Sequence, residues 1–298
     1  MEFISVAEAA KNWGLSERSV RNYCAQGRVA GAFLTGKTWN IPEDAGKPAR
    51  ANAKPAHESA LLQTLREERR TSARGGIYHK VQVELTYNSN HIEGSRLSLD
   101  QTRYIFETST LEMAGEAVRV DDVVETVNHF RCIDYLIDHA TEPLSEEMFK
   151  ELHRLLKSST SDSMKDWFAV GEYKRLPNEV GGMATSAPEN VHRDLQRALD
   201  AYARLDCVSL DDIIAFHVTF ERIHPFQDGN GRVGRLVMFK ECLRCGIVPF
   251  VITDDAKMFY YRGLANWYSE KGYLTDTCLA AQDEFKAALA YFRIPYDS

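Results

Sequence analysis

Residues 224–235 read HPFQDGNGRVGR, and this stretch joins two segments of helical character. Before it, Ser209 begins a run whose apolar residues recur with helical period, and Pro225 forces the chain out of helical geometry. After it, a second apolar run of helical period continues to the stop signals Gly246 and Pro249. The sequence therefore predicts a mainly helical protein in which His224 stands at the exit of one helix and glycines open the next.

The glycines of this stretch are suited to binding an anion. Gly229 and Gly231 flank Asn230, so the backbone can adopt positive φ values and gather several N–H groups on one concave surface. The helix that follows presents its N-terminal dipole and unpaired amides, which favour negative charge. Arg232 and Arg235 are three residues apart and share one side of the first turn. Two phosphates could be gripped there.

The remaining polar residues of the stretch complete a site for a nucleoside triphosphate. Asp228 would repel a phosphate unless a cation lay between them, and magnesium typically binds one or two carboxylates together with phosphate oxygens. His224, with an ordinary pKa of about 6.5, is the natural proton acceptor for a hydroxyl that attacks phosphorus. Positioning and charge stabilisation account for most of the catalysis in such reactions.

The stretch also permits two alternative interpretations. Residues 229–234 match the glycine pattern of dinucleotide-binding folds, but no strand precedes them and no βαβ unit surrounds them. Taken one at a time, His224 could be a core histidine, and Arg232 and Arg235 could form surface ion pairs. The joint pattern favours the nucleotide site.

The stretch also resembles the signature of the Fic family, H-P-F-x-D/E-G-N-G-R-x-x-R, at every defining position. The resemblance implies a mostly helical fold and transfer of AMP from ATP to a protein hydroxyl, with release of pyrophosphate. It further implies the role of each residue: His224 as base, Asp228 as Mg2+ ligand, Gly229, Asn230 and Gly231 as anion hole, Arg232 and Arg235 as phosphate ligands, and Phe226 as a buried anchor.

A second resemblance lies in residues 89–94, SNHIEG. Ser89 and Glu93 are four residues apart and so share one helix face, and Gly94 is a helix stop signal. The segment is similar to the inhibitory motif S/T-x-x-x-E-G/N of many Fic proteins. By that resemblance Glu93 would form a bidentate pair with Arg235 and deny this arginine to the γ-phosphate. The alternative is an ordinary exposed glutamate near a helix end.

Two further segments resemble parts of the family. Residues 171–175, GEYKR, and the following residues 176–188 look like the Fic flap, a hairpin that holds the target segment by strand pairing, with Gly181-Gly182 as its turn. A surface loop without function is the alternative. Tyr260 and Tyr261 resemble a tyrosine pair found near the nucleotide, where an aromatic ring could stack on adenine. On an amphipathic helix they could equally be core residues.

The first fifty residues differ in charge from the rest of the chain. They carry seven basic and five acidic side chains, a net charge of +2, whereas the whole chain carries −7. Ser5 and Ser16 are placed to cap two successive helices, and glycines then punctuate a short wing. This pattern resembles the helix-turn-helix of the MerR/excisionase type. The resemblance implies major-groove contacts by Arg18, Arg21 and Asn22, with Lys37 on a DNA phosphate. A module for protein contacts is the alternative.

The composition of the chain limits the classes of protein to which it can belong. The chain has 298 residues with 44% hydrophobic content, long enough for a substantial core. No segment reads as a membrane span or a signal peptide, so a cytoplasmic protein without membrane association is expected. The overall negative charge argues against nucleic-acid binding over the whole surface. Six scattered cysteines are expected to be reduced and structural, because the pair Cys242 and Cys245 lacks the partners of a zinc or redox site.

The predicted organisation has five parts: a winged helix-turn-helix (1–46), a linker (47–59), a helical region with the inhibitory helix (60–118), the Fic core with its hairpin flap (119–255) and C-terminal helices (256–298). Helices are expected at 61–70, 81–93, 99–112, 120–139, 146–156 and 191–205. The favoured function is a regulated protein adenylyltransferase that uses ATP and Mg2+, directed to DNA by its N-terminal domain. Two alternatives stay open, a DNA-binding regulator that senses nucleotide and an enzyme that removes AMP. The target protein, which could be this chain itself, and self-association are not determined.

Overall fold

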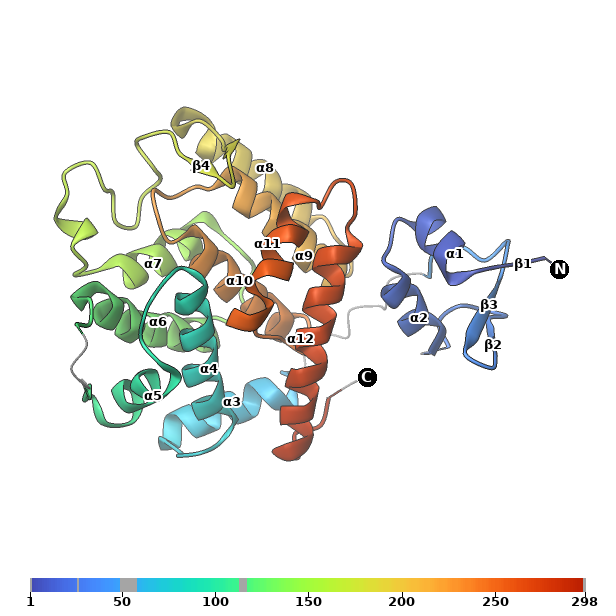
Figure 1. Cartoon of the computed structure of the whole chain (residues 1–298), viewed down its shortest axis with the longest axis horizontal. Helices are drawn as coiled ribbons and strands as arrows, with labels where there is room; N and C mark the ends of the chain where they lie inside the picture. Colours follow the sequence, from blue (N-terminus) through green and yellow to red (C-terminus); the bar gives the residue numbers. More distant parts are fainter. Residues whose placement is uncertain (1, 26, 49–57, 113–116, 297–298) are drawn as a thin grey trace.

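The computed structural model describes residues 2–25, 27–48, 58–112 and 117–296. Within these residues the chain is mainly helical, as the sequence predicts, and strands form only two small sheets. Figure 1 shows a small N-terminal unit beside a larger helical body, with helix α12 on the side of the body that faces the unit. No helix among the described residues combines the length and the apolar character needed to cross a membrane.

The N-terminal unit has its own small core. Its elements are β1 (Phe3–Ile4), α1 (Val6–Trp13), α2 (Glu17–Ala25), β2 (Phe33–Thr35) and β3 (Thr38–Pro42), and β3 pairs antiparallel with both other strands. Ser5 closes a capping box with Glu8, and the Ser16 hydroxyl accepts the N–H of Ser19. Strand β1 was not anticipated, because two residues are too few to show an alternating pattern. Apolar side chains from both helices and the sheet fill the interior.

The larger body consists of ten helices and one hairpin among its described residues. The helices are α3 (Ala60–Thr71), α4 (Ile77–Ile92), α5 (Leu99–Thr108), α6 (Val120–Asp138), α7 (Glu146–Lys157), α8 (Val191–Ala203), α9 (Leu210–Ile223), α10 (Asn230–Arg244), α11 (Lys257–Ala265) and α12 (Gly272–Tyr291). Short 3-10 turns lie at Asp162–Met164, Pro188–Asn190 and Asp254–Ala256.

Two helix ends differ from the sequence prediction by four residues, and the other ends agree within two. The helix expected from residue 81 already begins at Ile77, because the Glu68 carboxylate accepts the backbone N–H of Tyr78 and so caps the earlier start. The helix expected to reach residue 112 ends at Thr108, because Ser109 adopts a left-handed conformation with φ of 55°. Each of these two differences arises from one capping residue, Glu68 in the first case and Ser109 in the second.

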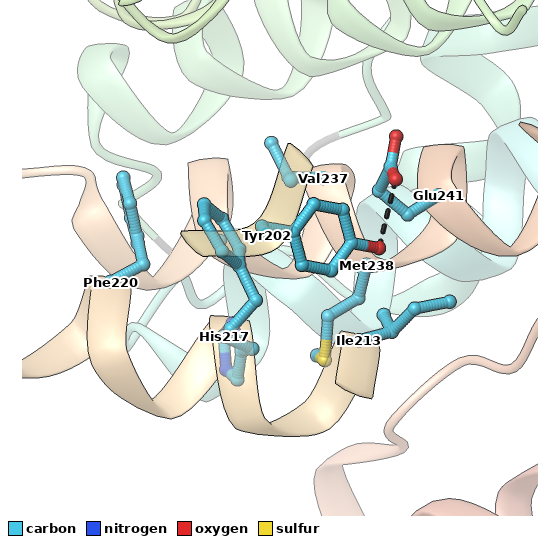
Figure 2. A pocket seen from close by; sticks show the side chains of 9 residues that line it. Tyr202, Ile213, His217, Phe220, Val237, Met238 and Glu241 are labelled. Carbon is cyan, nitrogen blue, oxygen red and sulfur yellow. Dashed lines mark hydrogen bonds between the residues drawn. The ribbon is translucent and has the colours of Figure 1, made fainter. Parts of the chain in front are cut away.

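Helix α10 occupies the centre of the larger body. Nearly all of its residues from Asn230 to Leu243 are buried, and it packs against α4, α6, α7 and α9 (Figure 1). Figure 2 shows one side of this packing, where the Tyr202 hydroxyl donates to Glu241 at 2.9 Å. The cavity lined by the side chains drawn in Figure 2 is too narrow for a water molecule. The loop that joins α9 to α10 is therefore held between two tightly packed helices.

The hairpin lies between α7 and α8 in the chain. Strands β4 (Glu179–Val180) and β5 (Met183–Ala184) pair antiparallel, with Val180 opposite Met183. Gly181 and Gly182 form the turn, with φ of 55° and 75°. A two-residue turn with positive φ at both positions suits glycine and matches the twist of the strands. The hairpin and its turn are thus where the sequence predicts them.

Candidate active site

The loop from His224 to Gly229, here called the catalytic loop, is closed by the side chain of Asn230. Its amide oxygen accepts the N–H of Phe226 and its amide nitrogen donates to the Phe226 carbonyl, both at 2.8 Å. The Phe226 ring is fully buried and stacks on His153, with the ring centroids 4.1 Å apart. Because the Asn230 amide closes the loop, only its backbone N–H remains for an anion.

The backbone at residues 229–231 opens α10, and we call it the cradle. Of the two glycines expected to adopt positive φ, only Gly229 does so, because Gly231 already belongs to the first turn of the helix. Gly229 has φ of 81° and stands at the N-cap of α10. The first N–H groups of a helix have no partner inside that helix. A Cβ atom on Gly231 would lie 2.3 Å from Glu93 Oε1 and 2.9 Å from Arg235 Nη1. A side chain at 231 would therefore displace the ends of Glu93 and Arg235, which lie directly against the cradle.

His224 is fixed at the end of α9 in a left-handed conformation with φ of 52°. Its Nδ1 lies 3.1 Å from the Glu221 carbonyl oxygen, which fixes the tautomer with the hydrogen on Nδ1 and leaves Nε2 as the basic atom. Burial lowers the pKa of the imidazole below its ordinary value, the nearby Lys174 lowers it further, and the Glu221 carbonyl opposes the shift. His224 is therefore neutral at pH 7 and able to accept a proton.

Asp228 belongs to a network of charges behind the cradle. Its Oδ2 accepts from Lys157 Nζ at 2.7 Å and from Arg232 at 3.2 Å, and Glu125 pairs with both of these cations. Burial would raise the pKa of the Asp228 carboxyl, but Arg232 and Lys157 hold it well below its usual range. The side chain keeps 49% of its surface exposed. A permanently ionised, half-exposed carboxylate beside an anion cradle fits a magnesium ligand.

Lys157 and Glu125 are site residues that the sequence analysis missed. Lys157 is buried at the end of α7, where it contacts Glu125, Asp162 and Asp228. Glu125 lies on α6, 107 positions before its partner Arg232. No local motif marks either residue, so only the packing of α6 and α7 against α10 could reveal them.

Arg235 is held by the segment that resembles the inhibitory motif. Its Nε donates to Ser89 Oγ at 3.0 Å, and its Nη2 donates to the Ser89 carbonyl at 2.9 Å and to Glu93 Oε1 at 2.7 Å. The expected pair between Glu93 and Arg235 is thus present, but it is a single contact rather than a bidentate one, since Glu93 bonds Nη2 and not Nη1. Gly94 follows with φ of 95°.

One donor of Arg235 is left over. Its Nη1 is buried and has no hydrogen-bond partner among the residues that the structure describes. A buried unpaired donor costs free energy unless a ligand satisfies it. Because Nη1 lies against Gly231, this donor faces the cradle.

The flap, residues 176–188, is attached to the catalytic loop by side-chain bonds. Asn178 Nδ2 donates to the Phe226 carbonyl at 3.0 Å, and the Leu176 N–H donates to Gln227 Oε1 at 3.2 Å. Lys174, just before the flap, donates its N–H to the Pro225 carbonyl at 2.8 Å. The hairpin therefore extends from the edge of the candidate site.

The two tyrosines on α11 have different surroundings. Tyr260 is 1% exposed within an apolar cluster, and its hydroxyl bonds His217 Nε2 at 2.7 Å. Tyr261 is 39% exposed and donates to the Ile92 carbonyl, next to Glu93. Of the pair, only Tyr261 offers open ring surface for stacking. Their assignment to nucleotide binding stays a prediction.

The residues expected to contact DNA lie on α2 and on the turn after β2. Arg18 pairs with Asp283 of α12, and Arg21 pairs with Glu17 one turn earlier in its own helix. Asn22 is partly buried, and Lys37 is exposed at the turn between β2 and β3. Of the two arginines, Arg18 is thus turned toward the larger body.

None of the six cysteines, all of which lie in described parts of the chain, takes part in a disulfide. Burial raises the pKa of Cys242 well above its ordinary value, and the thiol of Cys245 is shifted in the same direction. Among the described residues, no group of three or more His, Cys, Asp or Glu side chains could hold a metal ion.

Residues 143–242, from the start of α7 into α10, match the model of the Fic/DOC family. This stretch is similar to a Fic domain. The protein adenylyltransferase Fic of Drosophila willistoni is 29% identical over 226 residues, which cover 74% of this chain and 43% of that protein. The protein adenylyltransferase fic-1 of Caenorhabditis elegans is 27% identical over 185 residues, 60% of this chain and 35% of that protein. The chain thus spans less than half the length of these relatives.

Solved structures have a similar fold. A Fic domain-containing signaling protein from Bacteroides thetaiotaomicron superposes with a TM-score of 0.57 at 26% identity, over 77% of this chain and 90% of that one. Fic-1 from Caenorhabditis elegans gives a TM-score of 0.59 at 19% identity, over 78% of this chain and 72% of that one. These similarities confirm the mainly helical fold class that the sequence predicts.

Proposed function

We propose that this protein transfers AMP from ATP to a hydroxyl group of a protein and releases pyrophosphate. One observation carries the proposal: His224, the cradle of residues 229–231, Asp228 and Arg235 meet at the N-terminus of α10, and a buried donor of Arg235 faces the cradle without a partner. The names of the relatives from Drosophila willistoni and Caenorhabditis elegans support the same activity.

The reaction follows from the roles of these groups. The target hydroxyl oxygen forms a bond with the α-phosphorus of ATP while His224 Nε2 takes its proton. The bond between the α-phosphorus and the oxygen that bridges to the β-phosphorus breaks, and pyrophosphate leaves with that electron pair. Because Nδ1 faces the Glu221 carbonyl, Nε2 is the free basic atom, and burial keeps the imidazole neutral before the step.

The remaining residues bind and orient the nucleotide. The N–H groups at the start of α10 would donate hydrogen bonds to phosphate oxygens, and Arg232 and Arg235 would supply fixed positive charge. Asp228 would hold Mg2+, which neutralises charge on the phosphates when it is bound. The flap would pair with an extended segment of the target and present its hydroxyl to His224.

Glu93 restrains this activity in our proposal. Its carboxylate occupies Nη2 of Arg235 and lies where a side chain on Gly231 would be, so it fills space that a phosphate would need. A nucleotide would then bind productively only after Glu93 moves away. Autoinhibition of this kind needs no partner domain, because both residues belong to one body of the chain.

Mass spectrometry of the full chain tests the proposal. Parent protein and Glu93→Gly are incubated with ATP and magnesium, alone and with a lysate as a source of targets. A mass gain of one AMP unit on protein, larger for Glu93→Gly, is the expected result.

His224→Ala should abolish the mass gain, whereas His192→Ala, at an exposed histidine of α8, should not. Absence of AMP on any protein with Glu93→Gly would refute the enzyme assignment. Nucleotide-dependent DNA binding that persists in His224→Ala would then favour a nucleotide-sensing regulator.

A further inference from the structure

Lys174 joins three segments around the candidate site, although it lies outside the signature stretch. It is 3% exposed. Its ammonium donates to Asn178 Oδ1 and Thr185 Oγ1, each at 2.6 Å, and to the Ile223 carbonyl at 3.3 Å. Asn178 and Thr185 stand near the two ends of the flap, and Ile223 is the last residue of α9. One side chain thus connects both ends of the flap to the residue before His224.

The partners of Lys174 are all neutral oxygens. In the described part of the chain, no carboxylate lies within ion-pair distance of its ammonium, unlike Lys157, which has three. Loss of hydration lowers the pKa of Lys174 to about 8, and no acidic neighbour offsets this effect. An unneutralised positive charge is costly in such a place, and three good hydrogen bonds hold it there.

This charge acts on the imidazole of His224. The groups that face His224 are Lys174 before the flap, Glu221 on α9, Glu93 after α4 and Asp228 in the catalytic loop. Burial is the largest cause of the lowered pKa of His224, and Lys174 adds to it, whereas Glu93 and Asp228 oppose it. Burial also raises the pKa of Glu221 to about 8, so this carboxyl is mostly uncharged near neutral pH.

We propose that Lys174 is a positioning residue that fixes both ends of the flap to the end of α9 and sets a positive charge beside the base. The inference rests on the proposed transfer reaction for its purpose. The proposal itself concerns a physical coupling. The ammonium group of Lys174 contacts the flap, which would hold the target, and also lies beside His224, which would take the proton.

The coupling is tested by following the titration of His224 by nuclear magnetic resonance in the full chain, without nucleotide or target. The His224 signal is identified by its loss in His224→Gln. Lys174→Met removes the charge, and Asn178→Asp keeps the lysine but neutralises it with a side chain of the same size. Both variants should raise the apparent pKa of His224 by about half a unit or more.

Lys150→Met is the matched control, because Lys150 lies at the same edge of the site but pairs with Glu172. The Lys150→Met variant should leave the apparent pKa of His224 unchanged. Asn178→Asp adds an ion pair to Lys174 but also loses the bond from Asn178 Nδ2 to the Phe226 carbonyl. Asn178→Ala loses the same bond without adding a charge, so it should not raise the pKa of His224 as Asn178→Asp does. An unchanged His224 titration in both test variants, or an equal change in Lys150→Met, would overturn the proposal.

The second arm measures attachment of the flap. A glutamate-specific protease can cut the parent after Glu179 in β4, and Lys174→Met should be cut there severalfold faster than parent or Lys150→Met. Equal cleavage rates in the three proteins would contradict the proposal that Lys174 positions the flap. Neither arm requires catalytic activity, so failure of the adenylyltransferase assignment and failure of this inference give different results.

Discussion

Replacing Glu93 with glycine measures how strongly its carboxylate competes for Arg235. The two side chains share one charge-assisted bond of 2.7 Å, and the arginine side chain is 3% exposed. Such a bond contributes about 1.5–3 kcal/mol. Because the Glu93 side chain keeps 30% of its surface in solvent, we take the lower part of this range, about 1.5–2 kcal/mol. Loss of the competing bond should therefore tighten binding of magnesium ATP by about ten- to thirty-fold.

Calorimetric titration of parent and Glu93→Gly with magnesium ATP gives the two dissociation constants. Glu93→Gln, which keeps a hydrogen bond but loses the charge, should fall between them. Glu84→Ala is the matched control, because Glu84 is a half-exposed acid of α4 that pairs with Lys80. It should behave like the parent. Equal affinity of parent and Glu93→Gly would refute the reasoning, because the carboxylate would then not occupy space that the nucleotide needs.

The same variant carries an internal check. Without Glu93, buried Arg235 keeps its two bonds to Ser89 but loses its only carboxylate contact in the described residues. Removing one partner of a buried ion pair destabilises a fold. The thermal midpoint of nucleotide-free Glu93→Gly should therefore fall below that of the parent, and magnesium ATP should restore more of it than it adds to the parent.

Three further predictions follow from charges and burial. Asp228→Asn should raise the magnesium concentration needed for half-maximal ATP binding by at least about tenfold; calorimetry at varied magnesium checks this, and an unchanged requirement contradicts the ligand role. Unfolding free energy should fall as pH decreases below about 6.5, by up to about 1.4 kcal/mol per pH unit for each buried histidine, because the unfolded chain takes up protons that the fold excludes. Burial lowers the pKa to about 3 at three such positions, His129, His153 and His217. Denaturant titrations check this prediction, and a free energy of unfolding that stays constant between pH 7 and 5 contradicts it. If α2 binds DNA, Arg21→Ala should weaken an electrophoretic shift and reduce its salt dependence, and absence of any shift at low salt argues against DNA binding.

The sequence predicted those parts of the protein that have a local signature. Apolar residues of helical period located α9 and α10, and the glycines between them indicated the cradle before α10. The resemblance of residues 89–94 to the inhibitory motif led us to expect a pair between Glu93 and Arg235, and the structure brings these two side chains together. Each of these features depends on residues within one or two turns of each other, or on a motif with fixed spacing.

Other parts of the site depend on contacts that have no local signature. Lys157 and Glu125 reach Asp228 and Arg232 across 71 and 107 positions of the chain, and nothing in their own segments distinguishes them from surface charges. The Asn230 side chain also escaped prediction, because an amide that closes a loop and an amide that binds an anion look alike in sequence. Tertiary packing alone separates such cases.

The closure of the catalytic loop by Asn230 bears on how the protein ages. Asparagine followed by glycine, as at Asn230 and Gly231, is the dipeptide that deamidates most readily when the backbone is free to bend. Here Asn230 is 1% exposed, and both the oxygen and the nitrogen of its side-chain amide form hydrogen bonds with Phe226. The residue is also fixed in the first turn of α10. The folded protein therefore shields a chemically weak point. Any molecule that lost this shield and became aspartate would carry a negative charge at the phosphate cradle and an open loop beside it.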